Sequence, residues 1–242
     1  MAPLLPESVL KKRRVQEANA VKQAAASKER FKQARAAKRK TAFKRAEAFV
    51  KEFREKEADK KRVKRVTRCL ARDRYPVPPG ETLAVVVRLN GGRNIAPKAK
   101  KILAALRLAE RDTAVFVRLN AKTRAALRLV TPFIAYGAPS LKSVRELIAK
   151  RGFGTVNDQR VAISDNVVVE TALGAHGLVC VEDLVHEVAT LGEHFEQATA
   201  FLAPFVLSHP TGKFEQETLR QSKAGHPGDK GERINELLAH MI

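Results

Sequence analysis

Apolar and polar residues follow one another in a regular order between residues 83 and 136 of this chain. Short, nearly unbroken apolar runs predict buried strands, and they recur three times, at 83–89, 114–119 and 133–136. A helical pattern separates each pair of runs, because Pro97 opens one helix and Asn120 is placed to cap the next. We expect these helices to end near Leu108 and Val130. The order strand, helix, strand, helix, strand predicts a small sheet with helices on one face.

A weak internal repeat supports two successive strand-helix units. The tetrapeptide Val87-Arg88-Leu89-Asn90 recurs at residues 117–120, and the sequence of residues 104–108 recurs at 125–129. Strand and helix therefore come back in the same order. Coincidence in a chain rich in Ala, Leu and Arg is the alternative.

Beyond Gly137 the pattern is mainly helical. Ser140 is placed to cap one helix, and Asp165 or Ser164 to start another. The expected helices are 141–150, a segment that ends at Leu173, 181–191, about 193–201, and a last one with Ile234, Leu237, Leu238 and Met241 on one face. We also expect a loop at 152–158 and a short strand at 161–163, whereas residues 209–231 are polar and Gly-rich.

Lys and Arg are concentrated in the part of the chain before residue 73. Residues 1–72 hold 24 Lys and Arg against 8 Asp and Glu, a net charge of 24 − 8 = +16, whereas the remaining 170 residues carry 22 − 18 = +4. No Gly or Pro lies between Pro6 and Pro76, so this arm is expected to be largely helical where its charge is screened. Its apolar content is thin, and elsewhere it has too little apolar surface to bury. One stripe that could dock on the globular part or on a neighbour consists of Phe43, Ala46, Val50 and Phe53.

So dense a cationic segment normally becomes ordered only against a polyanion, and nucleic acid is the usual one. A membrane-surface helix and a merely solvated helix are the alternatives. Trp is absent and aromatic residues make up 5% of the chain, so phosphate contacts and shape should dominate over base stacking. RNA or DNA is therefore the first candidate partner.

Residues 75–80 cannot continue a helix, because three prolines remove backbone donors and favour extended geometry. The organisation we predict is a basic helical arm (1–75), a Pro-rich linker (76–81), a core (82–137) and a mostly helical extension packed on the core (138–242). Only two cysteines are present, the N-terminus does not read as a secretory signal, and the apolar stretches are too short to span a membrane. These features predict a soluble intracellular protein with plain thiols.

Signatures of catalysis and of metal binding each fail at a named residue. His186-Glu187 would begin a zinc-protease motif, but Thr190 stands where the second histidine is needed. Gly91-Gly92 follows a strand without a nucleotide-binding fingerprint. A zinc site built from His176, Cys180, His186 and His194 lacks the usual ligand spacing. We therefore expect no enzyme activity, no metal and no cofactor.

A Gly-rich turn before a helix is the first candidate phosphate contact in the folded part. Arg93 lies in the turn, and unpaired backbone amides at a helix start favour an anion. The first helical turns add Lys98, Lys100 and Lys101. The alternative is an ordinary strand-to-helix turn with solvated lysines.

The second candidate is Arg151-Gly152-Phe153-Gly154, which matches the opening of an aromatic RNA-recognition strand. The match fails at Thr155, where a stacking aromatic residue is needed. A more modest role is a loop in which Lys150 and Arg151 reach phosphate and Phe153 covers a base or sugar. In the alternative reading, Phe153 packs under the loop.

Several segments closely resemble a eukaryotic ribosomal protein: residues 131–144, 147–154, 163–166, 180–187 and Ile234-Asn235. The family is the large-subunit protein numbered thirty in bacteria and seven in eukaryotes, and the likeness covers nearly the whole chain, basic arm included. It implies an α+β fold: a ferredoxin-like β-α-β-α-β core with a long basic N-terminal helix and a helical C-terminal extension. It also implies no catalysis and a place in the large subunit, bound to ribosomal RNA. Residues 209–213 depart from the family's pattern, which leaves a backbone contact by this loop without support.

We therefore interpret the chain as a structural constituent of the large ribosomal subunit that binds and stabilises its RNA beside neighbouring ribosomal proteins. It is expected on cytoplasmic ribosomes after nuclear and nucleolar passage, with no membrane partner and no small-molecule substrate. A paralogous ribosome-assembly factor that binds precursor RNA is the nearest alternative, followed by a nucleic-acid-modifying enzyme and a polybasic membrane-surface protein. The candidate RNA contacts are Lys11, Lys12, Arg13, Arg14, Lys38, Arg39, Lys40, Lys44, Arg45, Lys60, Lys61, Arg62, Lys64, Arg65, Arg93, Lys98, Lys100, Lys101, Lys142, Lys150, Arg151 and Phe153.

Overall fold

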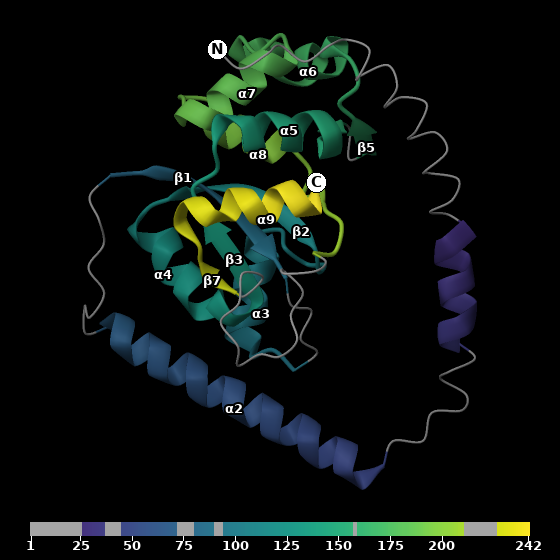
Figure 1. Ribbon diagram of the computed structural model, residues 1–242, viewed down its shortest axis with the longest axis vertical. Helices are drawn as coiled ribbons and strands as arrows, with labels where there is room; N and C mark the ends of the chain where they lie inside the picture. The colour runs from purple at the N-terminus through teal and green to yellow at the C-terminus, as the bar shows by residue number, and fades with distance from the viewer. Residues whose placement is uncertain (1–25, 37–44, 72–79, 90–93, 157–158, 211–226) are drawn as a thin grey trace.

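The computed structural model describes residues 26–36, 45–71, 80–89, 94–156, 159–210 and 227–242. Its centre is a mixed five-stranded sheet in the order β6-β2-β1-β3-β7 (Figure 1). The central strand, β1, pairs antiparallel with both β2 and β3. The strands are β1 (Thr82–Arg88), β2 (Thr113–Leu119), β3 (Ile134–Gly137), β6 (Phe205–Val206) and β7 (Gly228–Asp229).

The central strand buries side chains on both faces of the sheet. Ala84 and Val86 point to one face and Val85 and Val87 to the other, and all four are fully buried. The first face is covered by α3 (Pro97–Ala105) and α4 (Ala121–Val130), and the second by helices that follow β3. Burial on both faces explains why this strand is a continuous apolar run in the sequence. The predicted α+β class with a ferredoxin-like β-α-β-α-β core is confirmed.

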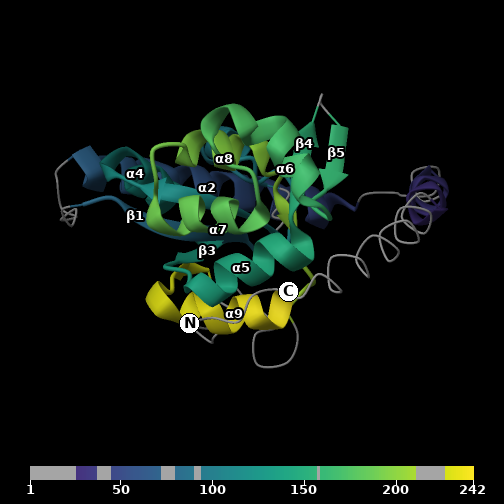
Figure 2. The ribbon, with the colours of Figure 1, turned by 90° about the horizontal axis from the view of Figure 1, so that it is seen from above.

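The segment after β3 folds over the second face of the sheet as a series of helices, which Figures 1 and 2 show from two directions. Among them, α5 packs against α7 and α9. The α-helices are α5 (Leu141–Arg151), α6 (Asn166–Leu173), α7 (Val181–Thr190), α8 (Phe195–Phe201) and α9 (Ile234–Met241). Short 3₁₀ turns follow α6, at η2 (Gly174–His176), and precede α9, at η4 (Gly231–Arg233); a third, η1 (Thr131–Phe133), connects α4 to β3.

The predicted caps of α4 and α5 are confirmed. Asn120 Oδ1 accepts a hydrogen bond from the Thr123 amide at 2.8 Å, and Thr123 Oγ1 accepts one from the Asn120 amide at 2.7 Å. Ser140 Oγ accepts a bond from the Ser143 amide at 3.2 Å. Asn235 of α9 then accepts bonds from the Ser140 amide and the Ser143 hydroxyl, both at 2.8 Å. The cap of α5 therefore also holds the last helix.

The expectation of a loop at residues 152–158 is wrong for residues 153–156, and residues 157–158 lie outside the described residues. Residues of β4 (Phe153–Val156) pair antiparallel with β5 (Gln159–Ala162) in a separate two-stranded sheet. The two glycines that suggested a loop instead allow close packing: a Cβ on Gly152 would lie 2.3 Å from the Ile148 carbonyl oxygen, and one on Gly154 would lie 2.3 Å from the Phe201 ring.

The two edge strands of the main sheet have no counterpart among the predicted strands. Both come from the extension: β6 pairs antiparallel with β2, and β7 pairs parallel with β3. The extension therefore completes the sheet as well as covering it. The division at residue 137 stays a prediction, and residues 76–79 of the predicted linker lie outside the described residues.

The arm contributes a 26-residue helix, α2 (Ala46–Ala71), which lies alongside the α3 and α4 face of the molecule (Figure 1). Val63 is 6% exposed, and Val66 and Leu70 pack in the same apolar cluster as side chains of α3 and α4. The prediction that the arm outside the stripe has too little apolar surface to bury is therefore wrong for residues 63–70 of α2. The predicted stripe does not make the contact, because Val50 and Phe53 are 49% and 68% exposed; Phe43 lies outside the described residues.

Candidate nucleic-acid interface

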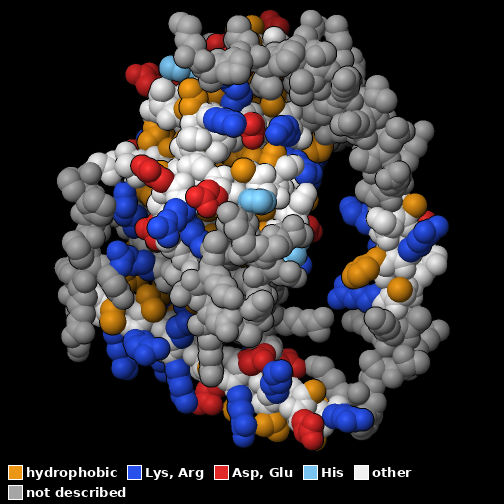
Figure 3. Space-filling model, in the orientation of Figure 1, with side chains coloured by type: hydrophobic (Ala, Val, Ile, Leu, Met, Phe, Trp, Pro, Cys, Tyr) orange, Lys and Arg blue, Asp and Glu red, His pale blue; other side chains and the backbone are white. Residues whose placement is uncertain are grey.

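Charge is unevenly distributed along α2. Residues 46–59 hold three Lys and Arg against five Asp and Glu, 3 − 5 = −2, whereas residues 60–71 hold six Lys and Arg and no acidic residue, 6 − 0 = +6. We call residues 60–71 the basic half of α2. Figure 3 shows Lys and Arg side chains gathered along this half of the helix. Cations near a helix C-terminus also interact favourably with the helix dipole, so the arrangement is compatible with a stable helix.

Specific contacts fix which side of the basic half faces outward. Asp59 accepts a hydrogen bond from the Ala96 amide at 2.5 Å and forms an ion pair with Arg62 at 2.7 Å. Arg62 Nη1 donates to the Leu129 carbonyl oxygen at 2.9 Å. These contacts and the buried Val63 turn one row of α2 toward α3 and α4. The row on the other side, Lys60, Lys61, Lys64 and Arg65, is exposed.

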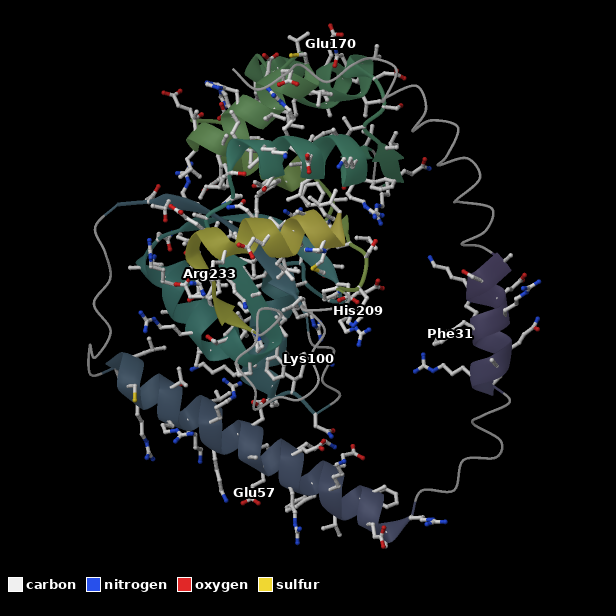
Figure 4. The ribbon with its side chains drawn as sticks, in the orientation of Figure 1. Phe31, Glu57, Lys100, Glu170, His209 and Arg233 are labelled. Carbon is white, nitrogen blue, oxygen red and sulfur yellow. The ribbon has the colours of Figure 1, made fainter. Side chains whose placement is uncertain are left out.

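The predicted site at the start of α3 differs from the expectation. The Ala96 amide is occupied by the Asp59 carboxylate, and Lys98 Nζ donates to Thr67 Oγ1 of α2 at 3.3 Å. The helix start is therefore partly used to hold α2, which limits its value as an anion site. Lys100 and Lys101 are exposed on α3, and Figure 4 marks Lys100 there. Glu57, also marked in Figure 4, points away from the sheet on the outer side of α2 and pairs with Lys61 at 2.9 Å.

Four further predicted contacts among the described residues lie across the sheet, on the side covered by the extension: Lys142, Lys150, Arg151 and Phe153. Lys142 is exposed in the first turn of α5, and Lys150 is exposed near the end of α5, 3.6 Å from Glu146. Arg151 donates to a backbone oxygen of Ile242 at 2.7 Å and to Ser208 Oγ at 3.0 Å, so it holds the C-terminal segment. The structure thus separates the candidates into two groups, one around α2 and α3 and one around α5.

Phe153 does not present its ring as a simple open platform. It lies in β4, and the guanidinium of Arg160 from β5 lies 3.9 Å from the centroid of its ring. Arg160 was missed in the sequence because its relation to Phe153 depends on the unrecognised hairpin. Arg68, in the last turn of α2, was also not among the predicted RNA contacts, although its spacing of four residues from Lys64 places both side chains on the same side of the helix.

Some arginines serve the fold rather than a partner. Arg88 is 8% exposed and donates to the Leu108 and Ala109 carbonyl oxygens, both at 2.7 Å, and burial lowers its pKa. Arg107 donates to the Thr199 and Leu202 carbonyl oxygens near the end of α8, at 2.6 and 3.0 Å. Overall charge alone therefore overstates the cations available to bind phosphate.

Nine of the predicted contacts lie outside the described residues, whereas Arg45 is exposed just before α2. The nine are Lys11, Lys12, Arg13, Arg14, Lys38, Arg39, Lys40, Lys44 and Arg93.

No metal site is found in the described part of the chain, where no group of three or more His, Cys, Asp and Glu residues could hold a metal ion. The Cys180 sulfur accepts a hydrogen bond from the Asp183 amide at 3.3 Å and caps α7, and burial raises the pKa of its thiol. The rings of His176 and His194 lie 5.0 Å apart as a packed pair. Within the same residues, none of the helices has the length and apolar character needed to cross a bilayer.

Two family models match this chain. A model described as the ribosomal L30 N-terminal domain matches residues 5–78, and one described as ribosomal protein L30p/L7e matches residues 84–134. Among similar proteins, the large ribosomal subunit protein uL30 of Yarrowia lipolytica is 43% identical over 97% of this chain and 94% of its own length. The uL30B of Schizosaccharomyces pombe is 42% identical (98% and 94%), and the uL30 of Caenorhabditis elegans is 40% identical (99% and 97%).

Proposed function

The chain belongs to the L30p/L7e family of ribosomal proteins, and on that premise we propose that it binds and stabilises the RNA of the large ribosomal subunit. It acts there as a structural component beside neighbouring ribosomal proteins. It acts in the cytoplasmic ribosome, after passing through the nucleus and nucleolus for assembly of the subunit.

One observation carries the RNA-binding part of the proposal: the basic half of α2 is docked on the core with an exposed row of cations. Asp59, Arg62 and Val63 hold the helix, while Lys60, Lys64 and Arg65 remain exposed. Cations held on a folded support lose less conformational entropy on binding than cations on a free chain. The row therefore suits the phosphates along an RNA backbone.

The second group of cations adds a contact on the opposite side of the sheet. Lys142 and Lys150 are exposed on α5, which lies across the sheet from α2. A protein with phosphate contacts on two sides can bind two RNA segments at once. In this proposal the core sets the spacing between those segments, and the arm extends the neutralised surface.

Neutralising the exposed row tests the proposal. Replacing Lys60, Lys64 and Arg65 together by Gln should lower affinity for deproteinised large-subunit RNA about 10- to 100-fold at low salt and reduce the salt slope by about three. Gln keeps helix propensity, so α2 should stay helical. Affinity is measured by filter binding or fluorescence anisotropy at several salt concentrations.

The matched control removes three cations from the other half of the same helix. Lys51, Arg54 and Lys56 lie among acidic residues, so replacing them by Gln should change affinity by less than about 3-fold. Equal losses from the two triple variants would contradict a role for the basic half, and unchanged affinity in the first variant would remove these three residues from the interface.

A further inference from the structure

In the β4–β5 hairpin, the side chain of Arg160 stacks on the ring of Phe153. The Arg160 guanidinium carbon lies 3.9 Å from the centre of the Phe153 ring, a separation that corresponds to direct stacking on the ring face. Thr155 pairs with Arg160 and Phe153 pairs with Ala162, so Phe153 and Arg160 are diagonal neighbours on one face of the hairpin. Their contact is therefore set by the strand register.

On the other face of the hairpin, the side chains of β4 pack on the protein, whereas Gln159 and Val161 of β5 are exposed. Side chains alternate along β4, so Gly154 and Val156 point away from the Phe153 face. Gly154 lies against the Phe201 ring of α8, and Val156 packs on the apolar core. The stacked pair consequently lies on the outward face, where Thr155 and Arg160 are exposed. Figures 1 and 2 show the hairpin at the edge of the molecule, next to α6.

The hairpin is anchored well enough to hold the pair in place. The Phe153 carbonyl oxygen accepts a hydrogen bond from the Ala203 amide at 2.8 Å, and Gly154 forms a bridge with Leu202. The Gly152 carbonyl oxygen accepts one from the Ile163 amide at 3.3 Å. β4 is thus bonded on both of its edges, to β5 and to residues 202–203.

We propose that the Arg160–Phe153 pair is a stacking platform for an unpaired base of the bound RNA. The inference rests on the proposed function and names the class of ligand at this position: a single unstacked nucleotide with its flanking phosphates. One face of the planar guanidinium covers Phe153, and its opposite face can receive a base, as arginine planes and aromatic rings do in single-stranded RNA recognition. Lys150, exposed at the end of the preceding helix, supplies a charge for a neighbouring phosphate.

Two RNA probes separate stacking from general attraction to phosphate. One is a stem-loop with a single bulged adenine, and the other is the same stem fully paired. The full chain should bind the bulged RNA about 10-fold more tightly, because base stacking on such a platform adds to phosphate contacts that both probes share. Arg160→Lys keeps the charge but loses the planar surface, so this variant should bind both probes with the affinity that the paired probe has.

Two further variants complete the test. Phe153→Leu keeps apolar volume but removes the support of the guanidinium, and it should also lose the preference. Gln159→Ala changes the residue next to Arg160 on the other face and should keep the preference in full. Thermal denaturation of each variant verifies that the fold is retained.

The outcomes distinguish this inference from the function on which it rests. Tight but equal binding of both probes by the unmodified chain, or an Arg160→Lys variant that keeps the preference, would overturn the stacking platform alone. Failure to bind either RNA would overturn the proposed function, and the platform with it.

Discussion

Between 50 and 200 mM monovalent salt, the affinity of the full chain for large-subunit RNA should fall about 10³- to 10⁵-fold. The estimate assumes six to ten phosphate contacts, each of which releases condensed counterions from the RNA. The arm carries a net charge of +16, and its described part places an exposed cationic row on α2, so this number of contacts is readily reached. A plot of log affinity against log salt concentration measures the effect.

A control separates charge screening from other effects of added solute. A neutral osmolyte at the same osmolality should leave the affinity almost unchanged, because it does not compete for phosphates. A slope near zero in salt would mean that base contacts or apolar burial dominate binding, and the proposed role of the arm would then be wrong.

Gly137→Ala should destabilise the fold by about 3 kcal/mol, roughly a 100-fold change in the folding equilibrium. A Cβ at this position would lie 2.1 Å from the Gly231 carbonyl oxygen and 3.0 Å from Ile234 Cβ. The first of these is a backbone atom, and the Ala138 amide donates to the same oxygen at 3.2 Å, so the segment before α9 would have to move. Chemical denaturation monitored by circular dichroism measures the loss.

Gly174→Ala is the matched control for that substitution. Gly174 has helical dihedral angles, φ −57° and ψ −32°, and the nearest atom to an added Cβ is 3.7 Å away. The new methyl group is therefore accommodated, and the lower entropy of the unfolded chain should make the change neutral or stabilising by less than about 1 kcal/mol. Equal stabilities for the two variants would mean that α9 is not closely packed on β3.

The sequence was most informative where burial and local chemistry agree. The three central strands are nearly continuous apolar runs because helices cover both faces of the sheet. Asn120 and Ser140 cap their helices by accepting hydrogen bonds from amides only three residues further along the chain. The resemblance read from residues 131–154 is confirmed by the family match, and with it the prediction that the protein is not an enzyme.

The missed elements share a physical cause. The edge strands β6 and β7 have two residues each, too few for any alternation of apolar and polar positions. At the start of β4 the sequence pattern is misleading. Gly152 and Gly154 suggest a loop, but glycine is required at these positions by close packing against Ile148 and Phe201. Such positions are determined by tertiary contacts that a local pattern does not contain.

The same limit applies to the candidate RNA contacts. Lys61 and Arg62 are adjacent cations in one run, yet Arg62 holds α2 against Leu129 whereas Lys61 is exposed. Likewise, Arg151 ties down the C-terminal segment whereas Lys150 beside it is exposed. Composition identified the charge, but only the docking of each helix decides which members of a basic cluster face outward.

Sedimentation of a native cell extract is the most direct test of a place in the large subunit. The chain should follow large subunits, monosomes and polysomes, remain with the large subunit when magnesium is removed and the subunits separate, and move to the top of the gradient after extensive ribonuclease digestion. Confinement to precursor particles, or sedimentation that ribonuclease leaves unchanged, would contradict a structural role that depends on ribosomal RNA.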